Sequence, residues 1–163
     1  MLRAPELSDA NQIYKWENDP ERLAHGRAGL PYSLQLIIDY INSYSETALS
    51  SGNVRFVIDI EGKAGGLADL YDIDFSARKA FVAIYVDEES RGKGIGADAL
   101  GELISFARGH LGLNQLVAVV GAENVPSRKL FLKAGFQDIA TLPDWCRGTD
   151  GALTDASLLL LKL

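Results

Sequence analysis

The stretch Arg91-Gly92-Lys93-Gly94-Ile95-Gly96 decides the fold, because it joins two segments with different hydrophobic patterns. The apolar run 81–86 before it predicts a strand, and residues 97–110 after it carry apolar side chains at helical spacing. Alternating glycines let the backbone pass close to a ligand with no Cβ in the way. The following helix would point its free N–H groups and the positive end of its dipole into the same space. Together with the charges of Arg91 and Lys93, this corner predicts a phosphate-binding site.

Two other phosphate-binding patterns fit the corner less well. Gly92-x-Gly94-x-x-Ala97 satisfies the loose dinucleotide fingerprint, but that fingerprint needs a parallel strand–helix–strand unit with an acidic residue closing the second strand. Here the preceding strand ends an antiparallel meander, so a nicotinamide-binding enzyme is a distant alternative. A P-loop needs Ser or Thr after its Lys, whereas Lys93 is followed by Gly94. A connector without a ligand would not require two cations beside the glycines.

The rest of the chain predicts a mixed α+β layout of helices, an antiparallel meander, strand–helix–strand–helix, and two final strands. Ser8 or Asp9 is expected to cap the first helix, and Ser33 the next long one. The continuous apolar run 116–120 predicts a strand buried on both faces. We interpret Leu158 to Leu161 as an ordinary buried strand, with an inter-subunit sheet as the alternative. The expected helices cover 9–18, 21–25, 34–44, 97–110 and 126–133, and the expected strands 2–4, 54–60, 66–73, 79–86, 116–120, 136–142 and 156–163.

Composition limits the classes of function. The chain has 163 residues, 47% of them hydrophobic, and we see no linker or repeat, which predicts one domain over 1–163. A net charge of −6 argues against nucleic acid or a membrane surface as partner and is compatible with a cationic amine substrate. The single Cys146 favours a reducing, cytoplasmic location, with no signal peptide. Because His25, His110 and Cys146 are scattered, we expect no metal site.

The chain resembles the GNAT superfamily of N-acetyltransferases. The acetyl-CoA signature of that family, Gln/Arg-x-x-Gly-x-Gly/Ala between the fourth strand and third helix, is matched at every specified position by residues 91–96. A second family block, Asn-x-x-Ser/Ala and then Gly-Phe, is matched by Asn124-Val125-Pro126-Ser127 and Gly135-Phe136. The segment Tyr14 to Asn18 is similar to the first helix of the branch that acetylates ribosomal-protein N-termini and polyamines.

The resemblance implies a GNAT-like fold: a central, mostly antiparallel, twisted sheet of about seven strands, splayed between strands 4 and 5 and flanked by about four helices. It also implies a place for acetyl-CoA as cosubstrate. Backbone N–H groups from Gly92 to Gly96 would hold the pyrophosphate, and the backbone of Ile84, Tyr85 and Val86 would pair with the pantetheine arm. Asn124 and Ser127 would lie near the thioester, although Asn124 has a second interpretation as a helix cap.

The catalytic groups are harder to assign, because the chain departs from its relatives. An alkyl amine has a pKa near ~10, so a proton must be removed before or during its attack on the thioester. Where many relatives carry a Tyr as general acid this chain has Phe131, and where some carry a Glu base it has Phe81. Ser127 is our substitute acid and Asp72 our candidate base. Asp69, Asp74 and a water chain are the alternatives for the base.

The predicted function is therefore transfer of an acetyl group from acetyl-CoA to a primary amine, either a small amine or polyamine or a protein N-terminus. The attack would be direct, in a ternary complex, without a metal ion. A catalytically silent CoA-binding module is the alternative, supported by the two phenylalanines at the expected acid and base positions. The acceptor stays open at this point, and so does the choice between a monomer and a homodimer.

Overall fold

The computed structural model describes residues 1–19, 30–148 and 150–163. The helical segments are η1 (Leu7–Asp9), α1 (Ala10–Glu17), α3 (Leu34–Thr47), η2 (Glu88–Ser90), α4 (Ile95–Gly109) and α5 (Val125–Lys133). The strands are β1 (Leu2–Arg3), β2 (Val54–Ile60), β3 (Lys63–Asp74), β4 (Lys79–Val86), β5 (Gln115–Gly121), β6 (Gln137–Arg147) and β7 (Leu153–Lys162). The turn expected at 21–25 lies outside the described residues.

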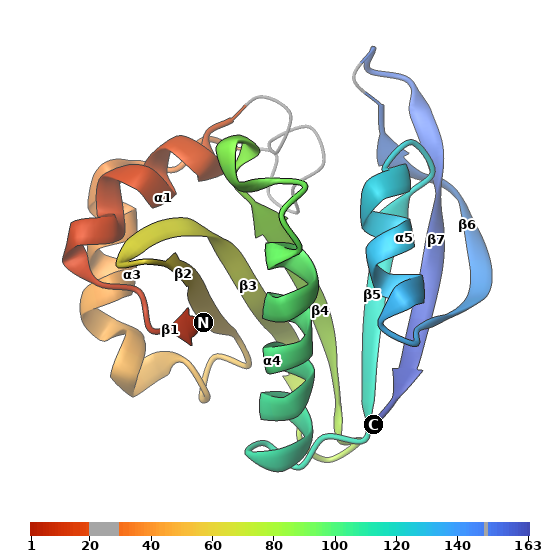
Figure 1. The fold of residues 1–163 in the computed structure, drawn as a ribbon, viewed down its shortest axis with the longest axis horizontal. Helices are drawn as coiled ribbons and strands as arrows, with labels where there is room; N and C mark the ends of the chain where they lie inside the picture. The colour runs from red at the N-terminus through yellow and green to blue at the C-terminus, as the bar shows by residue number, and fades with distance from the viewer. Residues whose placement is uncertain (20–29, 149) are drawn as a thin grey trace.

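All of these strands form one seven-stranded sheet in the order β1-β2-β3-β4-β5-β7-β6. Neighbouring strands are antiparallel except β4 and β5, which are parallel. The β4–β5 pairing covers only the three pairs from Lys79–Gln115 to Phe81–Val117, and beyond them the strands diverge (Figure 1). The predicted fold, including the splay between the fourth and fifth strands, is therefore confirmed.

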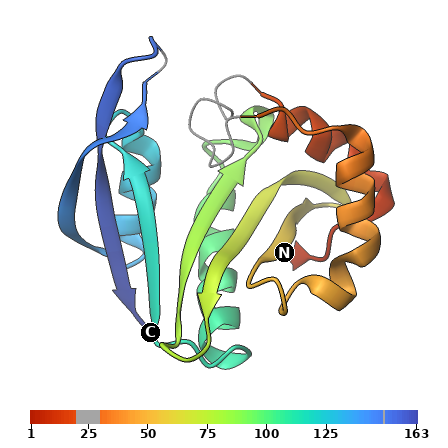
Figure 2. The same ribbon diagram turned by 180° about the vertical axis from the view of Figure 1, so that it is seen from behind.

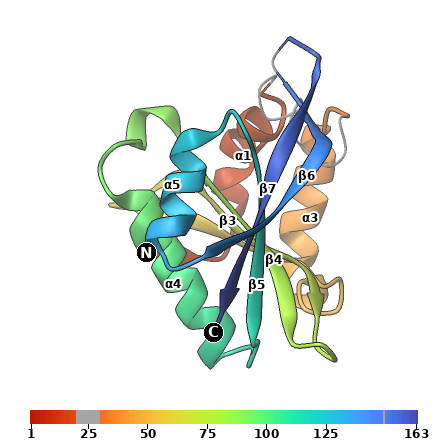
Figure 3. The same cartoon turned by 90° about the vertical axis from the view of Figure 1, so that its right-hand side faces the viewer.

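Helices cover both faces of one half of the sheet and a single face of the other half. Figure 3 shows α4 and α5 on one side and α3 on the other. The larger core packs α4 and α5 against the sheet through Leu100, Leu103 and Phe131, which are at most 2% exposed. The smaller core packs α1, through Ile13, and α3, through Ile37, against β2 and β3. Each apolar helix face thus meets one face of the sheet, as amphipathic helices require.

The expectation that β5 is buried on both faces is wrong. Alternate residues of β5 are buried, but Val117 and Val119 on its other face are only half-buried. None of the described helices lies over that face of β5, β7 and β6 (Figure 2). An apolar run predicts a strand but does not reveal how many layers cover it. In β7, Leu159 is fully buried between β5 and β6, so β7 is not free to pair with a second chain.

Two helix starts show how the local sequence sets the fold. The Ser33 hydroxyl accepts a hydrogen bond of 3.1 Å from the Leu36 N–H, which confirms the predicted cap of α3. Asp9 makes no cap bond to α1. Its carboxylate instead accepts the Glu6 N–H at 2.8 Å and two bonds from the Arg3 guanidinium, at 2.6 and 2.8 Å. Asp9 therefore ties the first strand to the first helix.

This pair predicts a pH-dependent loss of stability. The hydrogen bonds from Arg3 lower the pKa of Asp9, which is 5% exposed. A lowered folded-state pKa stabilises the protein above the unfolded pKa, near ~3.9, and this contribution is lost as the pH falls through the folded value. We expect Asp9→Asn to cost about 1–3 kcal/mol at pH 7. Urea unfolding at pH 7 and pH 3 should show a smaller stability difference for the variant. An unchanged difference between the two pH values would contradict this assignment.

Candidate functional site

The predicted phosphate corner has the backbone geometry that its glycines allow. Gly92 and Gly94 have φ angles of 77° and 84°, in the left-handed region that other residues avoid, and Gly94 is the N-cap of α4. A Cβ at either position would meet no atom within 4 Å, so open space lies beside both residues. Helix α4 begins at Ile95, two residues earlier than predicted, which brings Ile95 and Gly96 into its first turn.

The amide groups of the corner are available to a ligand. Ala97 and Asp98 donate to the Gly94 carbonyl, at 2.9 and 3.1 Å. Among the described residues, we find no hydrogen bond donated by the backbone N–H groups of 92–96. Such unpaired donors at the start of a helix, with the positive end of its dipole, form an anion-binding site. The residues present therefore fit the pyrophosphate of the coenzyme.

The two cations of the corner are tied to its own backbone. The Arg91 Nε donates to the Val86 carbonyl at 3.0 Å, and the Lys93 Nζ donates to the Glu89 carbonyl at 2.9 Å. Arg91 also lies over the Tyr85 ring, 5.9 Å from its centroid. Both side chains are exposed, so they add positive charge to the corner while bracing the loop.

The gap between β4 and β5 leads away from this corner. Val82 to Val86 pair with β3 on one side only, and Ala118 to Gly121 pair with β7 on one side only. Ile84, Tyr85 and Val86, which we predicted to bind the pantetheine arm, lie beyond the last of the three β4–β5 pairs found among the described residues. Strand edges of this kind accept an extended amide chain, as an added strand would. This edge of β4 therefore has the extended backbone that pairing with pantetheine amides requires.

Asn124 and Ser127 lie across the gap, where β5 leads into α5. The Asn124 Oδ1 accepts a 3.1 Å hydrogen bond from the Ser127 N–H, so Asn124 caps α5 as its second interpretation required. Gly96 lets α4 lie close to both β4 and α5. A Cβ at this position would lie 3.3 Å from the Val86 side chain of β4 and 3.6 Å from the Leu130 side chain of α5. The predicted coenzyme residues thus gather around one gap.

The three aspartates considered as bases lie in different surroundings on β3. Both Asp69 oxygens accept hydrogen bonds of 2.8 Å from Arg55. Asp74 caps a turn, accepting from the Ser76 hydroxyl at 2.6 Å and the Ala77 N–H at 2.9 Å, and these bonds lower its pKa. Asp72 is exposed, with a φ angle of 50°, on a bulge that follows Tyr71. Because the bulge interrupts the alternation, spacing alone does not place Asp72 and Asp74 on one face.

The two phenylalanines that replace acid and base candidates pack into the fold. Phe131 is 2% exposed and packs edge-on against Phe136, with ring centroids 5.0 Å apart. Phe81 stacks on Tyr71 at 5.4 Å, next to the last β4–β5 pair. Both positions therefore hold apolar rings that transfer no proton.

The sequence analysis missed a charged cluster on the α1 and α3 side of the sheet. Arg55 bonds to Asp69 and also contacts Glu17 of α1 at 2.6 Å. Burial opposes the guanidinium charge, but Asp69 and Glu17 outweigh it and raise the pKa of Arg55. The Tyr44 hydroxyl donates to the Arg55 carbonyl, and burial raises the pKa of Tyr44 to about 12. This cluster holds α1 and α3 close to β2 and β3.

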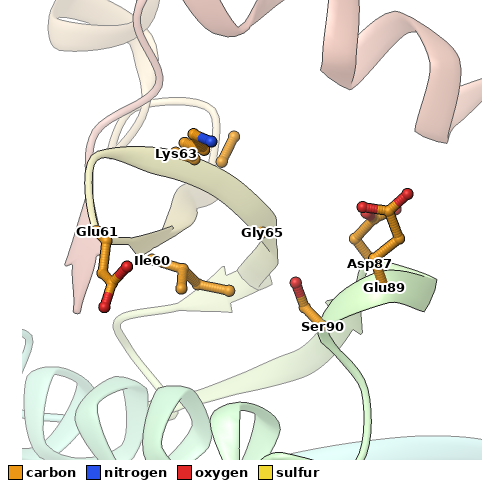
Figure 4. A pocket seen from close by; sticks show the side chains of 8 residues that line it. Ile60, Glu61, Lys63, Gly65, Asp87, Glu89 and Ser90 are labelled. Carbon is orange, nitrogen blue, oxygen red and sulfur yellow. The ribbon is translucent and has the colours of Figure 1, made fainter.

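A separate pocket of about 250 Å³ lies between the β2–β3 turn and η2. Figure 4 shows Asp87, Glu89 and Ser90 on one side of it, across from Ile60, Glu61 and Lys63. None of the residues that we predicted to bind the coenzyme or substrate lines it. Asp87 has a structural contact, since it accepts a 2.8 Å hydrogen bond from the Trp16 indole.

The two tryptophans and the single cysteine differ in burial. Trp16 is 3% exposed and packs on Tyr85, whereas Trp145 is 61% exposed on β6. Cys146 is half-buried, and burial raises the pKa of its thiol, which disfavours the reactive thiolate. No helix of the described residues is both long and apolar enough to cross a membrane.

Comparison with known proteins agrees with this geometry. A family model described as the acetyltransferase (GNAT) domain matches residues 1–137. The chain therefore belongs to the GNAT family of acetyltransferases, whose cosubstrate is acetyl-CoA.

Several characterised or named relatives are similar over part of the chain. A putative phosphinothricin acetyltransferase of Bacillus subtilis is 39% identical over 82 residues, covering 50% of this chain and 49% of that protein. The chain thus spans about half the length of this relative. Spermidine N(1)-acetyltransferase of Escherichia coli K12 is 24% identical over 135 residues, covering 83% of this chain and 71% of the relative.

Solved structures confirm the fold. The crystal structure of spermidine N-acetyltransferase from Vibrio cholerae, in complex with CoA and spermine, matches with a TM-score of 0.86. The sequence identity is 22%, and the match covers 99% of this chain and 94% of that chain.

Proposed function

We propose that this protein transfers the acetyl group of acetyl-CoA to a primary amine. The observation that carries the proposal is the β4–β5 pairing, which stops at Phe81–Val117 and leaves a gap that leads to the Gly92–Gly96 corner. The corner supports binding of the pyrophosphate, and the edge of β4 from Ile84 to Val86, beyond the β4–β5 pairs, supports binding of the pantetheine amides. The thioester would then lie inside the gap.

The chemistry proposed is direct attack in a ternary complex. The neutral amine nitrogen forms a bond to the thioester carbonyl carbon, the C–S bond breaks, and the electron pair leaves with the thiolate of CoA. The ammonium loses one proton before attack, the attacking nitrogen loses a second as the neutral amide forms, and the thiolate takes up one proton on release. This chain needs no covalent intermediate on its own residues.

Asp72 and Ser127 are the proposed proton-transfer groups. Asp72 is exposed and follows Tyr71, whose ring stacks on Phe81 at the point where β4 and β5 separate. This position supports Asp72 as the base that takes the ammonium proton, through water where necessary. Ser127 lies in the first turn of α5, across the gap, and is proposed to donate to the leaving sulfur.

For the acceptor we propose a small cationic amine. The net charge of −6 supports a cationic substrate, and the relatives named above include spermidine acetyltransferases. The location proposed is the cytoplasm, because a lone cysteine suits a reducing compartment. For the assembly we propose a homodimer, since Val117 and Val119 leave one half of the sheet with a half-buried apolar face.

A thiol-release assay tests the function. The protein is mixed with acetyl-CoA and each of a panel of amines: spermidine, 1,4-diaminobutane, n-butylamine, an N-terminal peptide and an aminoglycoside. We expect CoA release that depends on at least one small amine, with one acetylated product by mass spectrometry. Binding of acetyl-CoA without turnover on any of these amines would reject the enzyme in favour of a silent CoA-binding module.

A further inference from the structure

A side chain of α1 contacts the junction between β4 and the glycine corner. The indole Nε1 of Trp16, in the last turn of α1, donates a 2.8 Å hydrogen bond to the Asp87 carboxylate. Asp87 directly follows Val86, the last residue of β4, and is the N-cap of η2. Figures 1 and 2 both show the end of α1 beside the connection from β4 to α4. Trp16 therefore reaches the segment that leads into the proposed pyrophosphate site.

The main chain of Asp87 joins two further elements. Its N–H donates to the Gly65 carbonyl of β3 at 2.9 Å, and its carbonyl accepts the Ser90 N–H at 2.9 Å. The first bond continues the β3–β4 pairing by one residue, and the second closes the single turn of η2. Because the side chain is bound to α1, a strand, a turn and a helix all meet at this one residue.

The residue before this junction pair, Tyr85, is also held by β3 and α1. A Cβ on Gly66 of β3 would lie 2.2 Å from the Tyr85 carbonyl oxygen, so a glycine is required for this close approach. The Tyr85 ring packs on the Trp16 indole, with ring centroids 5.6 Å apart. The Arg91 guanidinium lies over the same Tyr85 ring, 5.9 Å from its centroid. Trp16, Tyr85 and Arg91 thus form one run of contacts from α1 to the start of the corner.

Three glycines give the corner little rigidity of its own. Gly92, Gly94 and Gly96 have no side chains, and glycine has more conformational freedom to lose than any other residue. Freedom that a loop keeps in the free protein is lost when a ligand binds, which weakens the binding. Contacts at the two ends of the loop remove part of that freedom in advance. Helix α4 fixes one end, and Asp87, through Trp16, fixes the other.

We infer that Asp87, bound by Trp16, is a positioning residue for acetyl-CoA. This inference rests on the proposed function, since it takes the corner to be the pyrophosphate site. The indole N–H orients the carboxylate toward α1, and this contact fixes the place where β4 ends and η2 begins. The N–H groups of 92–96 are then directed at the pyrophosphate before the coenzyme binds. The contact therefore sets the affinity for the coenzyme without touching the reacting atoms.

Isothermal titration of the protein with CoA tests this role without relying on turnover. Trp16→Phe removes the donor and keeps an aromatic ring beside Tyr85, and Asp87→Ala removes the acceptor. We expect each variant to raise the Kd for CoA by about 5- to 50-fold. The double variant should bind no more weakly than the weaker single variant, because both changes break the same bond. Asp87→Asn keeps an acceptor oxygen and should bring the Kd back to within about threefold of the wild type.

Tyr44→Phe is the matched control. Like Trp16→Phe, it removes the hydrogen-bond donor of an aromatic side chain on a helix and keeps a ring, but this bond joins α3 to the Arg55 carbonyl. We expect the control to lose stability in urea unfolding and to keep the wild-type Kd for CoA. Trp16 is 3% exposed whereas Asp87 is half-buried, so the two Asp87 variants decide the test if Trp16→Phe fails to fold.

The outcomes separate this inference from the proposed function. A wild type that binds no CoA would reject the proposed function and the inference with it. A wild type that binds CoA, with Asp87→Ala binding it equally well, would reject the positioning role alone. That role would also be overturned if Asp87→Asn lost as much affinity as Asp87→Ala, if the two single losses added up in the double variant, or if Tyr44→Phe lost as much affinity as Trp16→Phe.

Discussion

Gly94→Val should weaken the binding of acetyl-CoA by about 10- to 100-fold. Gly94 has a φ angle of 84°, and a β-branched residue in that conformation costs about 1–3 kcal/mol. The loop would relieve this strain by changing conformation, and the N–H groups of 92–96 would no longer converge on the pyrophosphate. Isothermal titration with CoA measures the effect, since CoA carries the same diphosphate and cannot be consumed.

Gly62→Val is the control for this substitution. Gly62 has a φ angle of 82° and, like Gly94, no atom within 4 Å of an added Cβ, but it lies in the β2–β3 turn. The Gly62→Val variant should lose about as much stability in urea unfolding as Gly94→Val, while keeping its affinity for CoA. If both variants lost affinity equally, or neither did, the corner would not be the pyrophosphate site.

Asp72→Asn should lower kcat by about 10²- to 10⁴-fold, the usual contribution of a general base. The amide keeps the size of the side chain but cannot accept the ammonium proton. The rising limb of the pH–rate profile should therefore disappear or move toward the pKa of the free amine, near ~10. Stopped assays across pH 6 to 10, with saturating acetyl-CoA and the best amine of the panel, measure both effects.

Asp74→Asn tests whether any carboxylate of this turn would give the same result. Asp74 is two residues away on β3 but is engaged by Ser76 and Ala77 as a turn cap. We expect its kcat and pH–rate profile to match the wild type, with a small loss of stability. A normal pH–rate profile in Asp72→Asn would instead assign proton removal to bulk water or to another group.

The sequence was most predictive where a change of period coincides with a change of backbone. The apolar run of β4 and the helical spacing of α4 bracket the glycines, so strand, corner and helix were predicted together. The splay of β4 from β5 could not be predicted in this way. Residues 81–86 and 116–120 are both simple apolar runs, and nothing in their spacing says that their pairing ends after three residue pairs. That feature came from the family resemblance.

The Arg55–Asp69 pair escaped sequence analysis because of a single bulge. A regular hairpin continued from the Ile60–Lys63 pair would place Arg55 opposite Ala68. The register shift between Val57 and Asp59 places Arg55 opposite Asp69 instead. Bulges change which side chains face each other, and no residue in this hairpin predicts a bulge from the sequence alone. In the structure the bulge appears as two adjacent buried residues, Val57 and Ile58.

Titration of ¹⁵N-labelled protein with CoA, followed by amide chemical shifts, tests the central claim most directly. That claim is that the diphosphate binds at the N-terminus of α4 and the pantetheine arm lies along β4. We predict large shifts for the amides of Gly92 to Gly96 and of Ile84 to Val86, with little change in β6. Saturable binding that leaves those amides unmoved, or moves only residues around the Glu61 and Glu89 pocket, would contradict it.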